Sequence, residues 1–210
     1  MFITFEGIDA SGKSTQIKLL EQYLIEQNFK VIVVREPGGT KLSEEIRNIL
    51  LSKENFSMVK ECEIFLFSAS RAQLVREVII PKLKEGFIVL SDRFHDSTTA
   101  YQGTGRDIKL EDVFVIHRIA IDDCIPDLTF FLDIPFEESI RRKKLIELSP
   151  DRIESMGKEF FERVREGYLQ IQKREPDRFK IINGVGSPSE IHKQIVQIFN
   201  DKLITLRGLR

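Results

Sequence analysis

The chain has few of the residues that mark disulfide-rich, zinc-binding or membrane-spanning proteins. Among its 210 residues there is no tryptophan, and the only cysteines, Cys62 and Cys124, lie far apart and outside any Cys-x-x-Cys or Cys/His pattern. This argues against a disulfide framework and a zinc site, so we expect two small buried thiols and a reducing compartment, the cytoplasm. The apolar runs span only four or five residues, too short to cross a bilayer, and we expect no secretory signal before the first of them.

A basic excess is also missing. Lysine and arginine together number 32, aspartate and glutamate 33, and the net charge is −1. Proteins that bind nucleic acids through their phosphates usually carry a basic excess or stripe, so we expect no nucleic-acid partner. A small phosphorylated ligand remains compatible with this balance. The length and the apolar fraction of 41% are those of one globular domain, spanning 1–210.

Five short apolar runs alternate with longer segments of helical periodicity. The runs lack polar alternation, which is typical of parallel strands buried on both faces. We expect strands at 2–5, 31–34, 87–90, 128–132 and 179–182. We expect helices at 14–27, 41–51, 58–84, 110–122, 136–145, 158–173 and 188–203, with Pro81 kinking or ending the third. This order predicts an α/β fold, a five-stranded parallel sheet flanked by helices on both faces.

Two segments do not follow this pattern. Residues 147–156 lack apolar periodicity and contain Pro150, so we interpret them as a mobile flap within a lid segment, 141–157. The last residues, 204–210, carry two arginines and are expected to be frayed.

A phosphate-binding loop follows the first predicted strand and opens the first predicted helix. Its residues match G-x-x-x-x-G-K-[ST] and are Gly7, Ile8, Asp9, Ala10, Ser11, Gly12, Lys13 and Ser14, followed by Thr15. The glycines let successive backbone N–H groups turn toward an anion, and the helix adds its positive dipole end. We expect Lys13 to reach the β- and γ-phosphates of ATP and the Ser14 hydroxyl to bind Mg²⁺.

Charged residues also follow the second and third predicted strands. Arg35 and Glu36 end the second, and Asp92 and Arg93 end the third, where ligands of a parallel sheet bind. Arg35 can grip a phosphate, Arg93 can face developing phosphoryl charge, and Asp92 is the preferred acidic metal ligand, with Asp133 as a weaker alternative. No Asn-Lys-x-Asp run is present to read guanine, which argues against a GTPase.

An aromatic and a guanidinium share one face of the long third helix. Phe67 and Arg71 lie four residues apart, so together they could stack on a flat base and hydrogen-bond its edge.

The phosphate loop, the runs 35–40 and 67–71, and the segment 92–103 occur in the order found in thymidylate kinases, which the chain closely resembles. The likeness continues through 125–129 and 151–154 and covers about residues 1–185. It implies a P-loop kinase with a helical lid that phosphorylates dTMP to dTDP with ATP and Mg²⁺ in dTTP biosynthesis. It also implies a homodimer packed through the helix at 58–84.

The resemblance further implies a role for each matching residue. Asp9 would help place the acceptor phosphate and the metal, while Arg35 and Arg93, with Arg47 nearby, would hold the dTMP phosphate. Phe67 would stack on thymine and Arg71 would hydrogen-bond its O4 edge. The nucleoside pocket would be lined by Ser97, Thr98 and Gln102, with Tyr101 where a ribose 2′-hydroxyl would clash.

One position departs from some members of that family. They carry an arginine directly after the loop aspartate, and this chain has Ala10 there. The transition-state cation must then come from elsewhere, and the basic residues in or beside the predicted lid are the obvious source. The resemblance favours Arg152 and Arg142 among them. The acceptor is an ionised phosphate oxygen, so we expect no strong general base.

Three other functions remain open on the residues alone. Another nucleoside monophosphate or deoxynucleoside kinase could use the same scaffold. A phosphate-loop ATPase or switch would hydrolyse ATP without an acceptor. A degenerate nucleotide-binding module would lack Lys13 or Arg93, and both are present.

Overall fold

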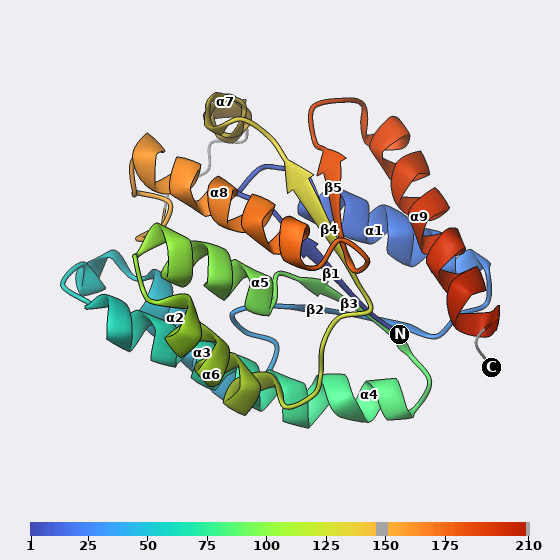
Figure 1. The fold of residues 1–210 in the computed structure, drawn as a ribbon, viewed down its shortest axis with the longest axis horizontal. Helices are drawn as coiled ribbons and strands as arrows, with labels where there is room; N and C mark the ends of the chain where they lie inside the picture. The colour runs from blue at the N-terminus through green and yellow to red at the C-terminus, as the bar shows by residue number, and fades with distance from the viewer. Residues whose placement is uncertain (146–150, 209–210) are drawn as a thin grey trace.

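The five predicted strands form one parallel sheet in the computed structural model, which describes residues 1–145 and 151–208 (Figure 1). They are β1 (Phe2–Glu6), β2 (Val31–Arg35), β3 (Ile88–Asp92), β4 (Leu128–Asp133) and β5 (Phe179–Asn183). Their order is β2-β3-β1-β4-β5, and every pair is parallel. All carboxyl ends therefore lie at one edge of the sheet, so the loops that follow β1, β2 and β3 are brought together.

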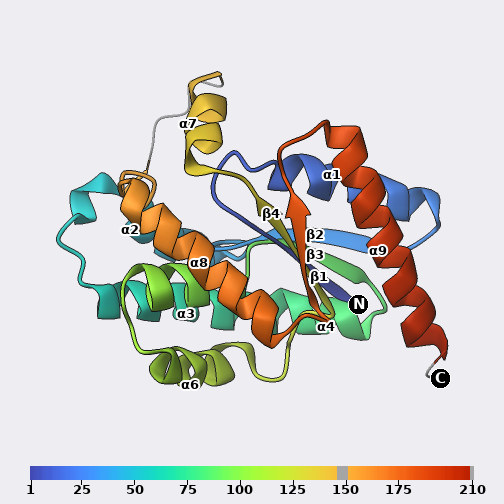
Figure 2. The ribbon, with the colours of Figure 1, turned by 45° about the horizontal axis from the view of Figure 1, so that its top comes forward.

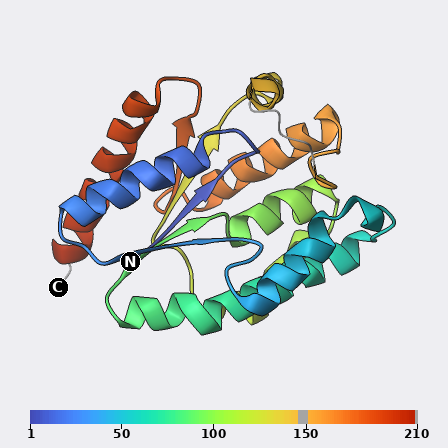
Figure 3. The same cartoon turned by 180° about the vertical axis from the view of Figure 1, so that it is seen from behind.

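Helices cover both faces of the sheet. They are α1 (Lys13–Glu26), α2 (Lys41–Leu51), α3 (Lys60–Leu74), α4 (Ile80–Lys84), α5 (His95–Thr98), α6 (Leu110–Ile121), α7 (Phe136–Leu145), α8 (Lys158–Arg174) and α9 (Pro188–Gly208). Figure 3 shows α1 and α9 on one face. Leu20 of α1, Phe199 of α9 and Phe5 of β1 belong to one buried cluster there. The other face carries α3, α5 and α8 over two further clusters. The predicted architecture is confirmed.

The long helix predicted at 58–84 is divided by a change in hydrogen bonding. A π-helical turn, η2 (Val75–Ile79), lies between α3 and α4. Pro81, at the start of α4, has no N–H to donate to the preceding turn, and a widened turn just before it accommodates that loss. The helix thus continues past Pro81 to Lys84 instead of ending there.

The segment after β3 is helical, which the periodicity of the sequence did not predict. α5 runs directly into a second π-helical segment, η3 (Thr99–Gly105). Helix α8 packs closely on η3 at Gly167, where an added Cβ would lie 2.9 Å from the Cα of Ala100. This close packing of a segment with weak helix formers and two glycines is a tertiary effect, because such residues do not favour a helix by themselves.

Two smaller expectations are wrong. Helix α9 continues to Gly208, so residues 204–208 are helical instead of frayed, and 209–210 lie outside the described residues. Cys62 is exposed, since it lies on the outer face of α3, whereas Cys124 is buried as expected. None of the described helices is both long and apolar enough to span a membrane.

The predicted lid segment, 141–157, comprises three parts. Residues 141–145 are the last part of α7, which stands beside the phosphate loop at the carboxyl edge of the sheet (Figure 2). Residues 146–150 of the predicted flap lie outside the described residues. Residues 151–157 form turns that precede α8, and the side-chain Nε–H of Arg152 joins them to α2 by donating to the carbonyl of Leu50 at 2.7 Å.

Candidate active site

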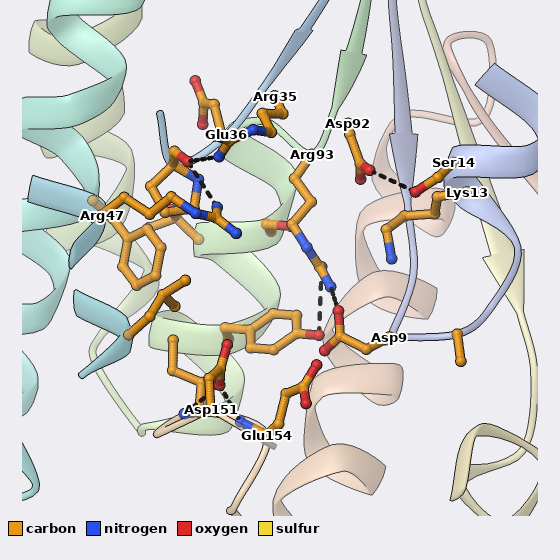
Figure 4. Close-up of a pocket in the computed structure, with 18 of the residues that line it drawn as sticks. Asp9, Lys13, Ser14, Arg35, Glu36, Arg47, Asp92, Arg93, Asp151 and Glu154 are labelled. Carbon is orange, nitrogen blue, oxygen red and sulfur yellow. Dashed lines mark hydrogen bonds and ion pairs between the residues drawn. The ribbon is translucent and has the colours of Figure 1, made fainter. Parts of the chain in front are cut away.

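A cavity of about 400 Å³ lies at the carboxyl ends of β1, β2 and β3. It brings together most of the predicted site residues, as Figure 4 shows. The predicted residues that line it are Asp9, Ala10, Gly12, Lys13, Ser14, Thr15, Arg35, Glu36, Arg47, Phe67, Asp92, Arg93, Ser97, Thr98, Tyr101 and Gln102. Of the predicted loop residues, Gly7, Ile8 and Ser11 lie outside its lining, and Ile8 packs in the core.

The phosphate loop has the backbone conformation that anion binding requires. Gly7 has φ of 139°, and a side chain there would lie 2.7 Å from the carbonyl of Leu132, so only glycine fits. The Lys13 ammonium is held in the loop, donating to the carbonyls of Gly7 and Ile8 at 3.0 Å each. Burial lowers the pKa of Lys13, and the nearby Arg93 adds to this. The carboxylates of Asp92, Asp9 and Glu6 oppose this shift, and an anion bound in the loop would favour the charged ammonium in the same way.

Ser14 and Asp92 lie side by side, as expected of two ligands of one cation. The Ser14 hydroxyl donates to the Asp92 carboxylate at 3.2 Å. The alternative ligand, Asp133, accepts two 2.7 Å hydrogen bonds from Arg165 and lies outside the cavity lining. The structure therefore favours Asp92 over Asp133.

Arg93 occupies the centre of the cavity. Its backbone is left-handed, with φ of 70°, which turns the side chain back toward the loop. The guanidinium donates to Asp9 at 2.9 Å, as Figure 4 shows, and to the Tyr101 hydroxyl at 3.4 Å. Burial tends to raise the pKa of Asp9, but Arg93 and Lys13 outweigh it and hold that pKa well below its ordinary value. Asp9 is thus an anion next to two cations.

Arg35 and Arg47 approach the cavity from β2 and α2. Both donate to the carbonyl of Pro37, at 3.2 Å and 2.8 Å respectively. Arg35 also makes a bidentate contact with Glu44, 2.9 Å to each oxygen, and its side chain is half-exposed. Two guanidinium groups therefore converge on one side of the cavity, opposite the phosphate loop.

Arg71 does not line the cavity, contrary to its predicted role at a base edge. It is 1% exposed and lies one layer behind the wall, where it donates to Glu36 at 2.7 Å and to the Thr98 hydroxyl at 3.0 Å. The cause is Glu36, whose buried carboxylate needs a cationic partner. Burial raises the pKa of Glu36, and Arg71 opposes that shift. Phe67, Thr98 and the other wall residues do face the cavity as predicted.

Of the two arginines predicted to supply a transition-state cation, only one lies near the phosphate loop. Arg142 lies over the phosphate loop and donates to the carbonyls of Ala10 at 3.2 Å and Gly184 at 2.8 Å. Arg152 is 2% exposed and turned away, ion-paired with the buried Glu63 at 2.6 Å. Arg152 therefore does not fit the role predicted for it in this conformation, and Arg142 is the nearer cation.

Sequence reasoning missed acidic residues from the turns before α8. Asp151 and Glu154 line the cavity, and Glu154 faces Lys143 at 3.4 Å. Asp151 accepts from the backbone N–H groups of Ile153 and Glu154, both at 2.8 Å, which shapes this turn. The run 151–154 was noted in the sequence, but nothing in its spacing showed that the turn would fold over the cavity.

Known proteins have similar sequences and a similar fold. The sequence model of the family described as thymidylate kinase matches residues 5–195. The chain belongs to the thymidylate kinase family. A thymidylate kinase from Kosmotoga olearia is 47% identical over 95% of this chain and 95% of the relative. One from Thermosipho melanesiensis is 49% identical over 97% and 99% of the two chains.

A solved thymidylate kinase structure supports the same assignment. The crystal structure of thymidylate kinase from Ehrlichia chaffeensis has a TM-score of 0.77 and 35% identity, covering 95% of this chain and 98% of the other. The predicted resemblance to the thymidylate kinase family is confirmed, and so is the predicted P-loop kinase fold.

Proposed function

We propose that this chain transfers the γ-phosphoryl group of ATP to dTMP, giving dTDP and ADP, in the supply of dTTP. The observation that carries the proposal is a single cavity with a phosphate loop at one end and an aromatic and amide wall at the other, in a chain 47% to 49% identical to proteins named thymidylate kinase. A nucleotide donor and a nucleotide acceptor can thus meet in one enclosure.

At the donor end, the loop N–H groups and Lys13 would bind the phosphates of ATP. The hydroxyl of Ser14 and the carboxylate of Asp92 are hard oxygen ligands of the kind Mg²⁺ prefers, and their 3.2 Å separation lets both reach one ion. Mg²⁺ bound there would neutralise phosphate charge. Asp9, also predicted as a metal ligand, is paired with Arg93, so we place it nearer the acceptor.

At the acceptor end, the thymine ring would stack on Phe67 and meet Gln102. The amide N–H of Gln102 donates to Glu63 at 2.9 Å, which leaves its Oε1 to accept from the ring N–H of thymine. Tyr101, 6% exposed, closes the cavity beside Arg93 and would exclude a ribose 2′-hydroxyl.

Between the two ends, Arg93 would stabilise charge on the transferred phosphoryl group, with Asp9 fixing its orientation. Arg35 and Arg47 would hold the acceptor phosphate, and Arg142 would supply the cation that Ala10 cannot. The nucleophile is an ionised phosphate oxygen, so the chain needs to remove no proton. Positioning and charge therefore account for most of the catalysis.

We also propose that the enzyme acts as a homodimer. Large apolar side chains are exposed on α3 (Phe65) and on α6 (Val115 and Ile119), and these would be suited to contact a second copy. The expected mass by light scattering is that of two chains, and Ile119→Asp should shift it to one. The free Cys62 and Cys124 support a reducing compartment, the cytoplasm.

The test of the reaction is ADP production from Mg·ATP with dTMP, thymidine, dUMP, dCMP, AMP, GMP or no acceptor. Turnover with dTMP, with dUMP behind it, is the expected result. Preference for thymidine would indicate a deoxynucleoside kinase. Hydrolysis that does not depend on an acceptor would indicate an ATPase, and would overturn the proposal.

A further inference from the structure

Glu63 is a buried carboxylate that belongs to none of the predicted site motifs. It lies on α3, one turn before Phe67, is 1% exposed and does not line the cavity. Three side chains donate to it: Gln102 at 2.9 Å, Arg106 at 3.0 Å and 3.1 Å, and Arg152 at 2.6 Å. One carboxylate thus joins α3, the cavity wall η3 and the turn before α8.

The two arginines keep this carboxylate charged. Burial opposes ionisation, but the hydrogen bonds from Arg106 and Gln102 outweigh it and lower the pKa of Glu63. An ionised carboxylate has no proton to donate, so it can only accept hydrogen bonds. The side of Gln102 that faces Glu63 must therefore be its NH₂ group.

The same contact determines what Gln102 offers to a ligand. A free glutamine amide can turn over and present either a donor or an acceptor. Here the NH₂ group is committed to Glu63, and among the described residues none donates to Oε1. Because Gln102 lines the cavity, a nucleobase meets an acceptor.

We propose that Glu63 is a positioning residue for base recognition, which makes the cavity discriminate by holding the amide of Gln102 in one orientation. A base with a ring N–H at the contact, such as thymine, finds a partner. Cytosine, which presents an unprotonated ring nitrogen there, faces acceptor against acceptor, a repulsive contact that lowers its affinity. This inference rests on the proposed function, because it assumes that the acceptor base lies against Gln102.

The experiment measures kcat and KM with dTMP and with dCMP for the wild type and for Glu63→Gln. In the variant two amides face each other and either can turn, so Gln102 can present its NH₂ group. We expect the ratio of kcat/KM for dTMP over dCMP to fall about tenfold, the equivalent of about 1.4 kcal/mol, through a higher KM for dTMP and with little change in kcat.

Two further variants distinguish the positioning of Gln102 from a general disturbance of the cavity wall. Glu63→Asp keeps the charge for the arginines but withdraws the carboxylate from Gln102, so it should lower the ratio even if Glu63→Gln does not fold. Arg106→Gln is the matched control: it removes two hydrogen bonds from the same carboxylate without touching Gln102, while Arg152 at 2.6 Å still keeps the carboxylate charged, so it should leave the ratio unchanged.

The outcomes are distinguishable. A lowered ratio in the folded Glu63 variants, but not in Arg106→Gln, supports the proposal. An unchanged ratio in Glu63→Asp, or an equal fall in Arg106→Gln, overturns it while the proposed function stands. A wild type that does not phosphorylate dTMP overturns the proposed function itself.

Discussion

The two ends of the cavity are built in different ways. The phosphate end comes from one continuous stretch, residues 7–15, in which backbone groups and Lys13 do most of the binding. The nucleoside end is assembled from α2, α3, η3 and the turn at 151–154, and buried ion pairs such as Glu36–Arg71 and Glu63–Arg152 hold these parts together. The first end therefore depends on local conformation, and the second on packing between distant segments.

This difference has a consequence for substitutions. A change in a phosphate-loop side chain that faces the cavity, such as Lys13, should alter catalysis and leave folding intact, because that side chain lies outside the hydrophobic clusters. A change in the supports of the nucleoside wall should alter stability or substrate affinity, because those side chains also fill the interior.

Lys13→Ala should have the largest effect on turnover. Its ammonium is the only cation that the loop itself carries, and we expect kcat to fall about 10³-fold. Lys18→Ala, on the exposed side of the same helix, should leave kcat unchanged. Steady-state kinetics and thermal melts of both variants would check this. A large loss of stability in Lys13→Ala would show that the phosphate end, like the nucleoside end, also supports the fold.

Arg93→Ala should lower kcat about 10²-fold, because Arg93 lies where the two ends meet. The variant also leaves Asp9 without its partner at 2.9 Å. Single-turnover measurements at saturating ATP and dTMP would isolate the chemical step. Near-normal turnover would show that Arg93 has only a structural role.

Arg142 and Arg152 should respond in opposite ways. Arg142→Ala should lower kcat/KM for ATP about 10- to 100-fold with little change in the melting temperature. Arg152→Ala leaves the buried Glu63 with one cation fewer and should reduce the free energy of unfolding by about 3–5 kcal/mol. Kinetics and denaturant titrations on both variants would check this. Loss of activity in Arg152→Ala and loss of stability in Arg142→Ala would instead identify Arg152 as the catalytic cation.

Phe67→Ala should raise the KM for dTMP about tenfold, since stacking of a base on an aromatic ring contributes about 1–3 kcal/mol to binding, and should change kcat little. Phe65→Ala, two residues earlier on the same helix and 60% exposed, should leave that KM unaltered. Initial rates over a range of dTMP concentrations would compare the two. An unchanged KM in Phe67→Ala would show that thymine does not stack on Phe67.

Glu6→Gln should have its effect on the pH dependence of stability. Burial, with Asp96 adding to it, raises the pKa of Glu6 from 4.5 to about 7, so the folded state binds its proton more tightly than the unfolded state. The stability that this protonation supplies is full below pH 4.5 and is lost as pH rises through about 7.

Glutamine imitates protonated Glu6, so the wild type should lose a few kcal/mol relative to the variant between about pH 5 and about pH 8. Burial lowers the pKa of His95 to about 4, which gives the opposite slope in both proteins and leaves the difference unaffected. Urea titrations at several pH values would measure it, and a constant difference would contradict the prediction.

Much of the phosphate end could be predicted from the sequence. The G-x-x-x-x-G-K-S spacing, the apolar strand before it and the charged residues after β2 and β3 are local signals, and parallel pairing makes them converge. The segment 95–105 could not be predicted as helical, because its glycines and β-branched residues disfavour a helix until α8 packs against it.

The sequence by itself determined the parallel sheet, the phosphate loop and the set of charged groups near it, because periodicity and spacing are properties of short stretches. Only the tertiary structure decided that Arg71 lies behind the wall, that Arg142 and not Arg152 faces the loop, and that Gln102 presents its oxygen. Each of these side chains has several possible partners. The one it takes depends on a buried carboxylate or carbonyl from another element, because a buried charge must find its counterpart within the fold.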